Sequence, residues 1–413
     1  MLHFMKDRGA AHGIAAENLS VDLDALMKRK DEVVGRMRKG VDALMKGNRI
    51  DVVQGHGKLA GKGKVEVSSG SDSQTQTLEA DHIILATGSA PAELPFMKFD
   101  GEHFVSSDEA IAFESIPENL IVIGAGAIGL ELGSVWSRLG SEVTMLEFLP
   151  QIAPTFDEDI AKLAHRYFKK QGITIETSTK VTDAKTLDDG RIVLRAEQNG
   201  DQKNYEADKV LVCVGRKPYT EDLGLESVGL DTDDQGRIEI DASFQTAAEG
   251  VYAIGDITAG PMLAHKAEEE GAACAERIAG HGAPVNYELV PNVIYTEPEI
   301  AGVGLTERDA KEKEIDCRVG KFSFLANGRA VAQDSTDGIV KILADAESDA
   351  LLGIQVVAHG GSELIASAVA HMEYGGSAED LGRTIHAHPT LSEAIKEAAL
   401  DVNNEAIHAM KKK

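Results

Sequence analysis

Apolar residues recur at helical spacing near the start of the chain. Between residues 22 and 46, leucine, valine and methionine return every three or four positions, which predicts one long amphipathic helix. We expect its methionine-rich stripe to pack in a core. Between residues 50 and 85, short alternating runs are broken by glycine and serine. That change predicts a small antiparallel meander that returns to a buried strand.

The middle of the chain alternates strand and helix patterns. Residues 120–124 and 142–147 are apolar enough for buried strands, and residues 127–140 between them follow helical spacing up to a terminal glycine. The alternation continues to about residue 216. It predicts a doubly wound α/β domain with a parallel sheet.

The last third of the chain mixes the two patterns. From about residue 289, strand-like runs stand beside helices that we expect near 362–376 and 390–400. This mixture predicts a separate α+β domain. A chain of 413 residues exceeds the size at which one hydrophobic core keeps growing, so about two to four domains are expected.

Composition narrows the class of protein. Hydrophobic residues make up 43% and charged residues 27% of the chain, as in soluble globular proteins. No apolar run approaches the roughly 18 residues of a membrane-spanning helix, and the N-terminus lacks the apolar stretch of a secretory signal. We expect a cytoplasmic protein without a membrane partner. The net charge of −26 disfavours nucleic-acid binding, because such a chain repels phosphate backbones.

The cysteines do not form a recognisable motif. Cys213, Cys274 and Cys317 are too far apart in the sequence for a zinc site or a Cys-x-x-Cys pair. Reactive cysteines need an accessible and electropositive setting. We therefore expect three structural thiols in a reducing compartment.

The strongest chemical motif is a glycine-rich turn. Gly124, Gly126 and Gly129 form G-x-G-x-x-G between an apolar strand and a helix. In such a motif the first glycine makes a tight turn, the second admits a pyrophosphate and the third lets helix and strand pack closely. Glu147 ends the next strand, where an acid would bind ribose hydroxyls and repel a 2′-phosphate. Because residues 148–151 contain no Arg or Lys, NAD is favoured over NADP; the alternative is a glycine-rich turn without a ligand.

Three further strand patterns also end in glycine, at Gly88, Gly215 and Gly255. Open α/β sheets bind ligands at the carboxyl ends of their strands, where glycine permits close backbone approach. Several such endings indicate more than one bound nucleotide. Asp256 is a candidate for a hydrogen bond to a sugar hydroxyl or for capping a turn. Pro261 is expected at the first position of the next helix, whose amides could stabilise negative charge on a reduced cofactor ring.

Residues 386–393, with the sequence HAHPTLSE, contain a candidate general base. Histidine side chains titrate near neutral pH, and a nearby carboxylate can orient the ring, which makes His388 and Glu393 a candidate pair. Thr390 and Glu393 also fit a capping box, in which Glu393 would only cap a helix. A metal site at His386 and His388 lacks an evident third ligand, and His386 is expected to be structural.

Together these motifs resemble those of the pyridine-nucleotide disulfide oxidoreductases, in the family's order and along nearly the whole chain. The residues that carry the resemblance are 86–89 (ATGS), 124–131 (GAGAIGLE), Glu147, 213–218 (CVGRKP), 253–256 (AIGD), 262–271 (MLAHKAEEEG), 295–304 (YTEPEIAGVG) and 386–393 (HAHPTLSE). The combination is specific, although its single members are not. The members that oxidise dihydrolipoamide are the most similar.

The resemblance implies two cofactors and a catalytic pair. It implies contacts to FAD from Gly57, Thr87, Gly88, Ser89, Asp256, Met262, Leu263, Ala264 and His265. It implies contacts to NAD from Gly124, Ala125, Gly126, Ala127, Ile128, Gly129, Leu130, Glu131, Glu147, Val181 and Gly215, with Glu131 near the junction of nicotinamide and flavin. It also implies that His388 is the proton acceptor, that Glu393 orients it, and that both act across a homodimer interface on the partner subunit. It implies no metal ligand.

By the same resemblance, the fold comprises two Rossmann-like doubly wound dinucleotide-binding domains and a C-terminal α+β dimerisation domain. Residues 1–116 would be the remainder of the FAD-binding domain, 117–216 the NAD-binding domain, 217–288 a central FAD segment and 289–413 the dimerisation domain. The implied activity is NAD-dependent oxidation of protein-bound dihydrolipoamide to lipoamide through FAD and a redox disulfide. The implied partners are the lipoyl domains of 2-oxo-acid dehydrogenase or glycine-cleavage complexes.

One departure from the family pattern is severe. The family begins with an FAD-binding strand, its own G-x-G-x-x-G and a Cys-x4-Cys redox pair, and none of these is in the sequence. We therefore expect an N-terminally truncated chain that by itself does not catalyse the dithiol reaction. Two alternatives stay open: a non-catalytic remnant that binds NAD or dimerises, and a relative that reduces glutathione or mercuric ion. Loss of a strand and its helix should also leave apolar surface exposed in the first domain.

Overall fold

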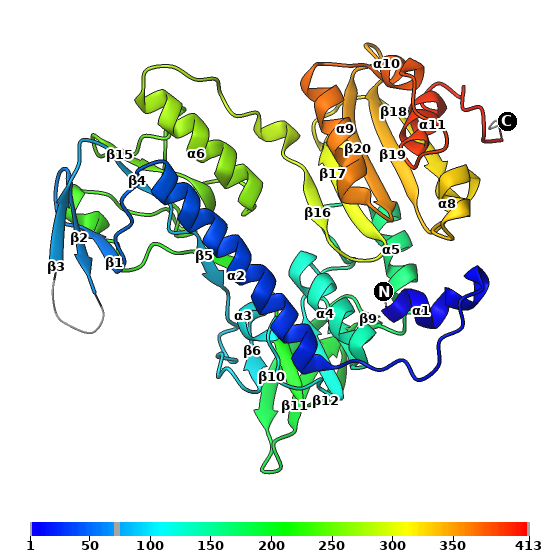
Figure 1. The fold of residues 1–413 in the computed structure, drawn as a ribbon, viewed down its shortest axis with the longest axis horizontal. Helices are drawn as coiled ribbons and strands as arrows, with labels where there is room; N and C mark the ends of the chain where they lie inside the picture. Colours follow the sequence, from blue (N-terminus) through cyan, green and yellow to red (C-terminus); the bar gives the residue numbers. More distant parts are fainter. Residues whose placement is uncertain (1, 70–74, 411–413) are drawn as a thin grey trace. The chain divides into compact units, whose positions relative to one another are not determined.

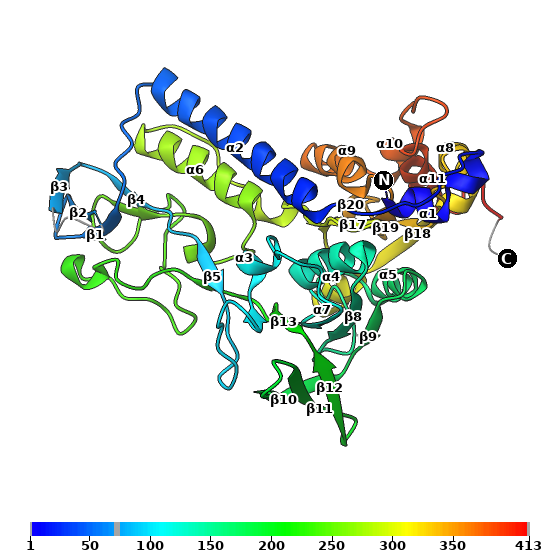
Figure 2. The same ribbon diagram turned by 60° about the horizontal axis from the view of Figure 1, so that its bottom comes forward.

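A computed structural model describes residues 2–69 and 75–410. Its helices and strands are drawn in Figure 1 and Figure 2, coloured along the sequence. The chain forms two compact units. Unit 1 contains the residues up to 23, residues 93–214 and the residues from 288 onwards, and unit 2 contains residues 24–92 and 215–287. The boundaries of the four segments expected from the sequence stay a prediction.

A five-stranded parallel sheet forms one part of unit 1. Its strands, in spatial order, are β6 (Phe104–Val105), β13 (Lys209–Val212), β7 (Asn119–Ile123), β8 (Glu142–Leu146) and β9 (Thr174–Glu176). Helix α4 (Ala127–Leu139) connects β7 to β8, and α5 (Glu158–Lys170) connects β8 to β9. The apolar residues of β7 and β8 are at most 5% exposed, as expected for strands covered on both faces. The predicted doubly wound α/β fold is confirmed.

An antiparallel meander follows β9 in unit 1. It consists of β10 (Thr179–Thr186), β11 (Ile192–Gln198) and β12 (Asp201–Ala207). Ile192 and Leu194 of β11 are fully buried in a cluster that also contains Ile123 and Val212 of the parallel sheet. The meander therefore shares a hydrophobic core with the carboxyl ends of β7 and β13.

The C-terminal part of unit 1 is an antiparallel sheet with helices. The strand order is β16 (Asn292–Ile294), β17 (Glu299–Gly304), β20 (Leu351–Ala358), β19 (Ile339–Asp345) and β18 (Cys317–Ser323). Helix α9 (Gly361–Glu373) packs on β17 and β20, and α11 (Glu393–Asp401) packs on β18 and β19 (Figure 1). The predicted α+β fold and both of its predicted helices are confirmed, although this part of the chain belongs to the same compact unit as the parallel sheet.

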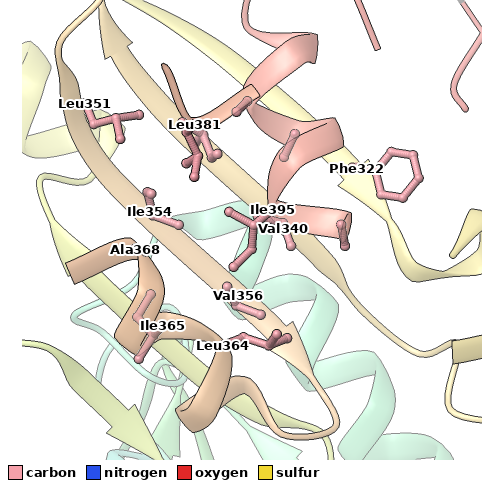
Figure 3. Close-up of a cluster of buried hydrophobic side chains, with 14 of the residues drawn as sticks. Phe322, Val340, Leu351, Ile354, Val356, Leu364, Ile365, Ala368, Leu381 and Ile395 are labelled. Atoms are coloured by element: carbon pink, nitrogen blue, oxygen red, sulfur yellow. The ribbon is translucent and has the colours of Figure 1, made fainter. Parts of the chain in front are cut away.

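Apolar side chains fill the space between this sheet and its helices (Figure 3). Ile354 and Val356 of β20 and Ile395 of α11 are 0% exposed. Ile365 of α9 belongs to the same cluster. Each fully buried aliphatic side chain contributes about 1.5–3 kcal/mol. This core therefore holds α11, and with it the end of the loop that precedes α11.

Unit 2 has three small sheets among its described residues. Strands β1 (His56–Leu59), β2 (Lys64–Ser68) and β3 (Thr75–Glu79) form an antiparallel meander, β4 (Ile83–Leu85) pairs in parallel with β15 (Val251–Ala253), and β5 (Ser89–Pro91) pairs antiparallel with β14 (Arg216–Pro218). Helix α6 (Ala264–Ile278) follows β15. The predicted meander and its return to a buried strand, β4, are confirmed.

Helix α2 (Leu23–Gly47) confirms the predicted long helix but corrects its predicted burial. None of its residues is buried, and Val34, Met37, Val41 and Leu44 are between 49% and 69% exposed. The expectation that the methionine-rich stripe packs in a core is wrong for the described chain, because no described element covers this face. An exposed apolar surface is present here, as expected for the first domain.

Shorter helices complete the described chain. They are α1 (Leu2–Asp7), α3 (Ser107–Ala110), α7 (Glu307–Glu312), α8 (Gly328–Ala332), α10 (Ala378–Arg383) and the 3-10 turns η1 (Gly9–His12), η2 (Leu225–Val228), η3 (Gly255–Ile257), η4 (Tyr287–Leu289) and η5 (Phe324–Ala326). In the part of the chain that the structure describes, no helix combines the length and the apolar character needed to cross a membrane.

Replacing Ile354 by alanine should destabilise unit 1, because the change leaves a cavity between β20 and its covering helices. We expect a loss of about 2–5 kcal/mol in the free energy of unfolding. Urea unfolding followed by far-UV circular dichroism measures this loss. Leu325→Ala is the control, because Leu325 is 72% exposed and its truncation should cost less than about 0.5 kcal/mol. Equal losses in the two variants would contradict the described core.

Candidate functional site

The turn between β7 and α4 carries the glycine motif. A Cβ atom on Gly124 would lie 2.4 Å from the carbonyl oxygen of Cys213, and one on Gly129 would lie 2.0 Å from the carbonyl oxygen of Gly124. Neither position can therefore carry a side chain. A Cβ atom on Gly126 would meet no described atom within 4 Å. Close packing at two glycines and open space at the third fit a turn that admits a pyrophosphate.

The buried carboxylate of Glu147 lies beside this turn. Its Oε2 accepts a hydrogen bond from the amide of Ala125 at 2.6 Å, and its Oε1 accepts one from the amide of Leu149 at 2.7 Å. Each oxygen keeps a lone pair that a ribose hydroxyl can use. Gly126 is the N-cap of α4 and has no side chain to bind the first amides, so these amides are available to an anion.

Most of the other residues expected around NAD lie in the first two turns of α4. They are Ala127, Ile128, Leu130 and Glu131. The Oε1 atom of Glu131 accepts a hydrogen bond from the amide of Tyr295 at 2.8 Å. Burial raises the pKa of Glu131, because a low-dielectric environment disfavours the charged carboxylate. The structure thus places a partly buried acid in the second turn of α4, just after the glycine motif.

Two of the expected NAD contacts lie away from the glycine turn. Val181 belongs to β10 and is 8% exposed. Gly215 belongs to unit 2. Its φ of +125° lies in a backbone region that favours glycine. Their contact with NAD stays a prediction.

Unit 2 brings Ser89 and Asp256 together. Because β4 and β15 are parallel, the residues that follow them lie at the same sheet edge. The hydroxyl of Ser89 donates a hydrogen bond to Oδ2 of Asp256 at 2.5 Å. The hydroxyl of Thr87 donates to the carbonyl of Tyr219 at 2.6 Å, and Gly88 turns the chain with φ +74°. This edge offers the Asp256 carboxylate as an acceptor to a polyhydroxyl ligand.

Arg216 is part of this arrangement, although no role for it was predicted from the sequence. Its Nε donates to the hydroxyl of Ser89 and its guanidinium donates to the carbonyl of Ser89, both at 2.7 Å. Arg216 lies in the CVGRKP motif, which could have marked it as a site residue. Only the pairing of β14 with β5 shows that it contacts Ser89.

Helix α6 begins later than predicted. Its first residue is Ala264 and its N-cap is Leu263, so the expectation that Pro261 occupies the first helical position is wrong. Met262, Leu263, Ala264 and His265 therefore form the extended approach and the first turn of α6. Gly57 lies in β1, in a different sheet of the same unit.

The predicted catalytic pair forms in the loop before α11. Nδ1 of His388 lies 2.9 Å from Oε1 of Glu393, and the histidine side chain is 78% exposed. The other oxygen, Oε2, accepts a hydrogen bond from the amide of Thr390 at 2.8 Å. One carboxylate therefore orients the histidine and satisfies a backbone amide. His386 contacts the carbonyl of Thr384 at 2.9 Å instead.

Only half of the predicted capping box is present. The Thr390 hydroxyl contacts the carbonyl of Ala387 and the hydroxyl of Ser392, and Ser392 is the N-cap of α11. Asn327, which is 4% exposed, donates its side-chain amide to the carbonyl of Thr390 at 3.0 Å. The loop is thus held from α8 as well as from α11.

The three cysteines are free thiols. Burial raises the pKa of Cys213 to about 12 and also raises the pKa of Cys274 and of Cys317. Because the thiolate is the nucleophile, these groups are poor redox centres. Their interpretation as structural thiols agrees with these environments.

A group of three carboxylates lies elsewhere in unit 1. Asp157, Asp159 and Glu307 approach one another closely enough to hold a cation. The ammonium of Lys341, which is 1% exposed, forms ion pairs with all three. A lysine therefore already occupies the centre of this group.

Two family models match this chain. Residues 2–271 match the pyridine nucleotide-disulphide oxidoreductases, and residues 290–399 match the dimerisation domain of the same family. The match to the dimerisation domain supports a homodimer.

Relatives match over nearly the whole chain. A mitochondrial dihydrolipoyl dehydrogenase from Pisum sativum is 45% identical over 99% of this chain and 81% of its own length. Dihydrolipoyl dehydrogenase 3 from Pseudomonas putida is 44% identical over 98% of this chain and 88% of its own length. The crystal structure of LpdA from Mycobacterium tuberculosis matches with a TM-score of 0.88 at 26% identity, covering 96% of this chain and 86% of that one. The chain therefore belongs to the pyridine nucleotide-disulphide oxidoreductase family.

Proposed function

We propose that this protein is a flavoprotein of the dihydrolipoyl dehydrogenase type, which uses NAD to oxidise protein-bound dihydrolipoamide to lipoamide. The observation that carries the proposal is the identity of 44% and 45% with two dihydrolipoyl dehydrogenases over nearly the whole chain. Enzymes of this family use FAD and NAD. The geometry of the glycine turn and of the Ser89–Asp256 edge is compatible with both cofactors.

We propose that NAD binds at the glycine turn of unit 1. The contacts would come from residues 124–131 and Glu147, with Val181 and Gly215 as further contacts. The free amides at the start of α4 would face the pyrophosphate. The carboxylate of Glu147, fixed by two backbone amides, would accept ribose hydroxyls and repel a 2′-phosphate. These groups support NAD over NADP.

We propose that FAD binds at the edge of β4 and β15 in unit 2. The contacts would come from Gly57, Thr87, Gly88, Ser89, Asp256, Met262, Leu263, Ala264 and His265. Bound FAD would supply the exchange of electrons with NAD as a hydride. The part of the protein is to hold the cofactor's hydroxyl groups through Ser89 and Asp256, which already contact each other.

We propose that His388 accepts the thiol proton of the substrate. A thiolate, not a thiol, attacks a disulfide, so a base must remove the proton. Glu393 holds Nδ1 of the ring, which leaves Nε2 for the thiol proton. By the family pattern, His388 and Glu393 act across the dimer interface on the partner subunit.

The cysteine content limits what this chain does by itself. Its 413 residues contain no Cys-x4-Cys pair, and the disulfide half of the reaction needs one. The exchange of a hydride between NADH and FAD needs no cysteine. We therefore propose this flavin half-reaction as the one that the residues of this chain support directly.

The proposed partners follow from the same assignment. The lipoyl domains of 2-oxo-acid dehydrogenase or glycine-cleavage complexes would present the dihydrolipoamide group. The division of the chain at residues 116, 216 and 288 into an FAD part, an NAD part, a central FAD segment and a dimerisation part belongs to the proposal. The cytoplasmic location also stays a prediction.

Two alternatives to the proposed dihydrolipoyl dehydrogenase activity can be weighed on specific residues. A non-catalytic remnant that binds NAD or dimerises is favoured by the lack of a Cys-x4-Cys pair. A reductase acting on glutathione or mercuric ion is disfavoured by Glu147, since such enzymes use NADPH.

An anaerobic titration of the purified, FAD-loaded protein tests the proposal. NADH should bleach the visible absorbance band of the flavin, and NADPH should do so at least about tenfold less efficiently, because of the acid at Glu147. Protein that takes up no FAD would support the non-catalytic alternative. Preference for NADPH would support the glutathione or mercuric reductase alternative.

Replacing Gly126 by alanine should weaken NADH binding without unfolding the protein. The added methyl group meets no described atom within 4 Å, so the fold should tolerate it, but it would occupy the space proposed for the pyrophosphate. We expect the dissociation constant for NADH to rise about tenfold or more. Gly328→Ala at the start of α8 is the control, because that Cβ atom also meets nothing described within 4 Å. An unchanged dissociation constant in Gly126→Ala would remove the turn from the NAD site.

The pKa of Glu393 should depend on the Thr390 amide and on two nearby histidines. The amide of Thr390 first, then His388 and last the charge of His386, hold this pKa below its ordinary value of 4.5 against the partial rise that burial causes. His388→Gln should therefore raise the pKa of Glu393 only in part, as measured by NMR titration of its carboxyl carbon. Because the pKa is lower in the folded than in the unfolded chain, Glu393 stabilises the fold above about pH 4.5, and this contribution is lost as the pH falls through the folded pKa.

His386→Gln is the matched control for this titration. His386 hydrogen-bonds to Thr384 and lowers the pKa of Glu393 only through its charge, as the last of the causes, so its replacement should move the pKa of Glu393 less than His388→Gln does. A full return to 4.5 in His388→Gln would show that the Thr390 amide is not the main partner.

A further inference from the structure

A fully buried ion pair lies in α6, next to the proposed FAD edge. Nζ of Lys266 is 3.1 Å from both carboxylate oxygens of Glu270. The two residues are one helical turn apart, and their side chains are only 1% exposed. No role was predicted for either residue from the sequence, although both lie in the MLAHKAEEEG motif.

Lys266 and Glu270 hydrogen-bond to both backbone polar groups of Gly255. The amide of Gly255 donates to Oε2 of Glu270 at 2.7 Å, and Nζ of Lys266 donates to the carbonyl of Gly255 at 3.1 Å. The hydroxyl of Thr258, itself 1% exposed, donates to the same carbonyl at 2.9 Å. We call these contacts of Lys266 and Glu270 with the backbone of Gly255 the clamp. Because Gly255 has φ +74°, the clamp holds a left-handed turn that a residue with a side chain would disfavour.

Stability alone does not account for this arrangement. Taking two charges out of water costs several kcal/mol per ion, and well-packed apolar residues can often replace a buried ion pair without loss of stability. What apolar residues cannot do is bond to the amide and carbonyl of Gly255. The specific consequence of the pair is therefore the fixed geometry of this turn.

The clamped turn presents Asp256. Asp256 directly follows Gly255, and its Oδ2 accepts the hydrogen bond from Ser89. Ser89 is held in turn by Arg216 from β14. The position of the Asp256 carboxylate is thus fixed from two directions, by α6 through the backbone and by β14 through Ser89.

Tyr287 completes the environment of Glu270. Its hydroxyl donates to Oε1 of Glu270 at 2.8 Å. Burial and the Glu270 carboxylate together raise the pKa of Tyr287 above its usual range, which keeps the hydroxyl protonated as a donor. The carboxylate of Glu270 thereby has three partners: an ammonium, a phenol and a backbone amide.

We propose that Lys266 and Glu270 are positioning residues, which clamp Gly255 so that Asp256 meets the sugar-alcohol hydroxyls of FAD. This inference rests on the proposed FAD site. Neither side chain would touch the cofactor, because both are buried behind the turn. They act through the backbone of Gly255.

The test is FAD affinity in a variant without the clamp. Lys266→Met/Glu270→Met removes both charges together, so no buried charge is left without a partner. We expect the dissociation constant for FAD, measured by quenching of flavin fluorescence on titration into the full chain, to rise about tenfold or more, as for loss of hydrogen bonds to charged groups. The visible spectrum of the bound flavin should shift toward that of free FAD.

A rescue variant separates positioning from stability. In Lys266→Met/Glu270→Gln, the glutamine carbonyl can still accept the Gly255 amide, so FAD affinity should recover to within about threefold of the wild type. Lys341→Met is the control for lost stability: that lysine is also 1% exposed and ion-paired, its loss leaves Asp157 without this ammonium partner, and it lies in unit 1. It should lower the melting temperature and leave FAD affinity unchanged. All variants are compared at a temperature where circular dichroism shows them folded.

Each outcome decides one question. FAD affinity that stays at the wild-type level in Lys266→Met/Glu270→Met overturns the clamp and leaves the FAD site standing. Equal weakening in Lys341→Met shows that lost stability, not positioning, lowers affinity, and also overturns it. Wild-type protein that binds no FAD overturns the proposed FAD site and the clamp together. Weakening in the double methionine variant alone, with rescue by glutamine, supports the clamp.

Discussion

Glycine turns with positive φ at the carboxyl ends of parallel strands are the constraint on which both candidate cofactor sites depend. In unit 1, the carbonyl oxygens of Cys213 and Gly124 lie where side chains at Gly124 and Gly129 would have to be. In unit 2, Gly255 follows β15 in a left-handed turn. The crowded backbone in unit 1 and the left-handed turn in unit 2 each place an acid, Glu147 or Asp256, close to a strand end. This is where an open α/β sheet binds its ligands.

Carboxylates that accept backbone amides recur at each site. Glu147 bonds to Ala125 and Leu149, Glu270 to Gly255, and Glu393 to Thr390. Such charge-assisted bonds are about twice as strong as neutral ones. At Glu393 one oxygen accepts the Thr390 amide and the other contacts His388. The two roles considered for Glu393, binding a backbone amide and orienting the histidine, are therefore both filled by the same side chain. Local structure and candidate chemistry therefore share the same groups.

Sequence patterns predicted the α/β core, the α+β domain, the glycine turn and the His388–Glu393 pair, because each depends on residues close together in the sequence. Two local predictions were wrong. Pro261 fits the start of a helix, but α6 begins at Ala264. The stripe of α2 has the spacing of a packed face, but none of its residues is buried. Periodicity shows which face is apolar and does not show whether another element covers it.

The sequence by itself determined the family, the order of the strands along the chain and the residue types at each turn, since glycine spacing and apolar periodicity are properties of the chain alone. Only the tertiary structure decided which distant residues meet. Arg216 reaches Ser89 because β14 pairs with β5, Asn327 reaches Thr390, and Lys266 and Glu270 reach Gly255 because α6 packs against the turn after β15. These contacts depend on packing between elements far apart in the sequence, which no local pattern encodes.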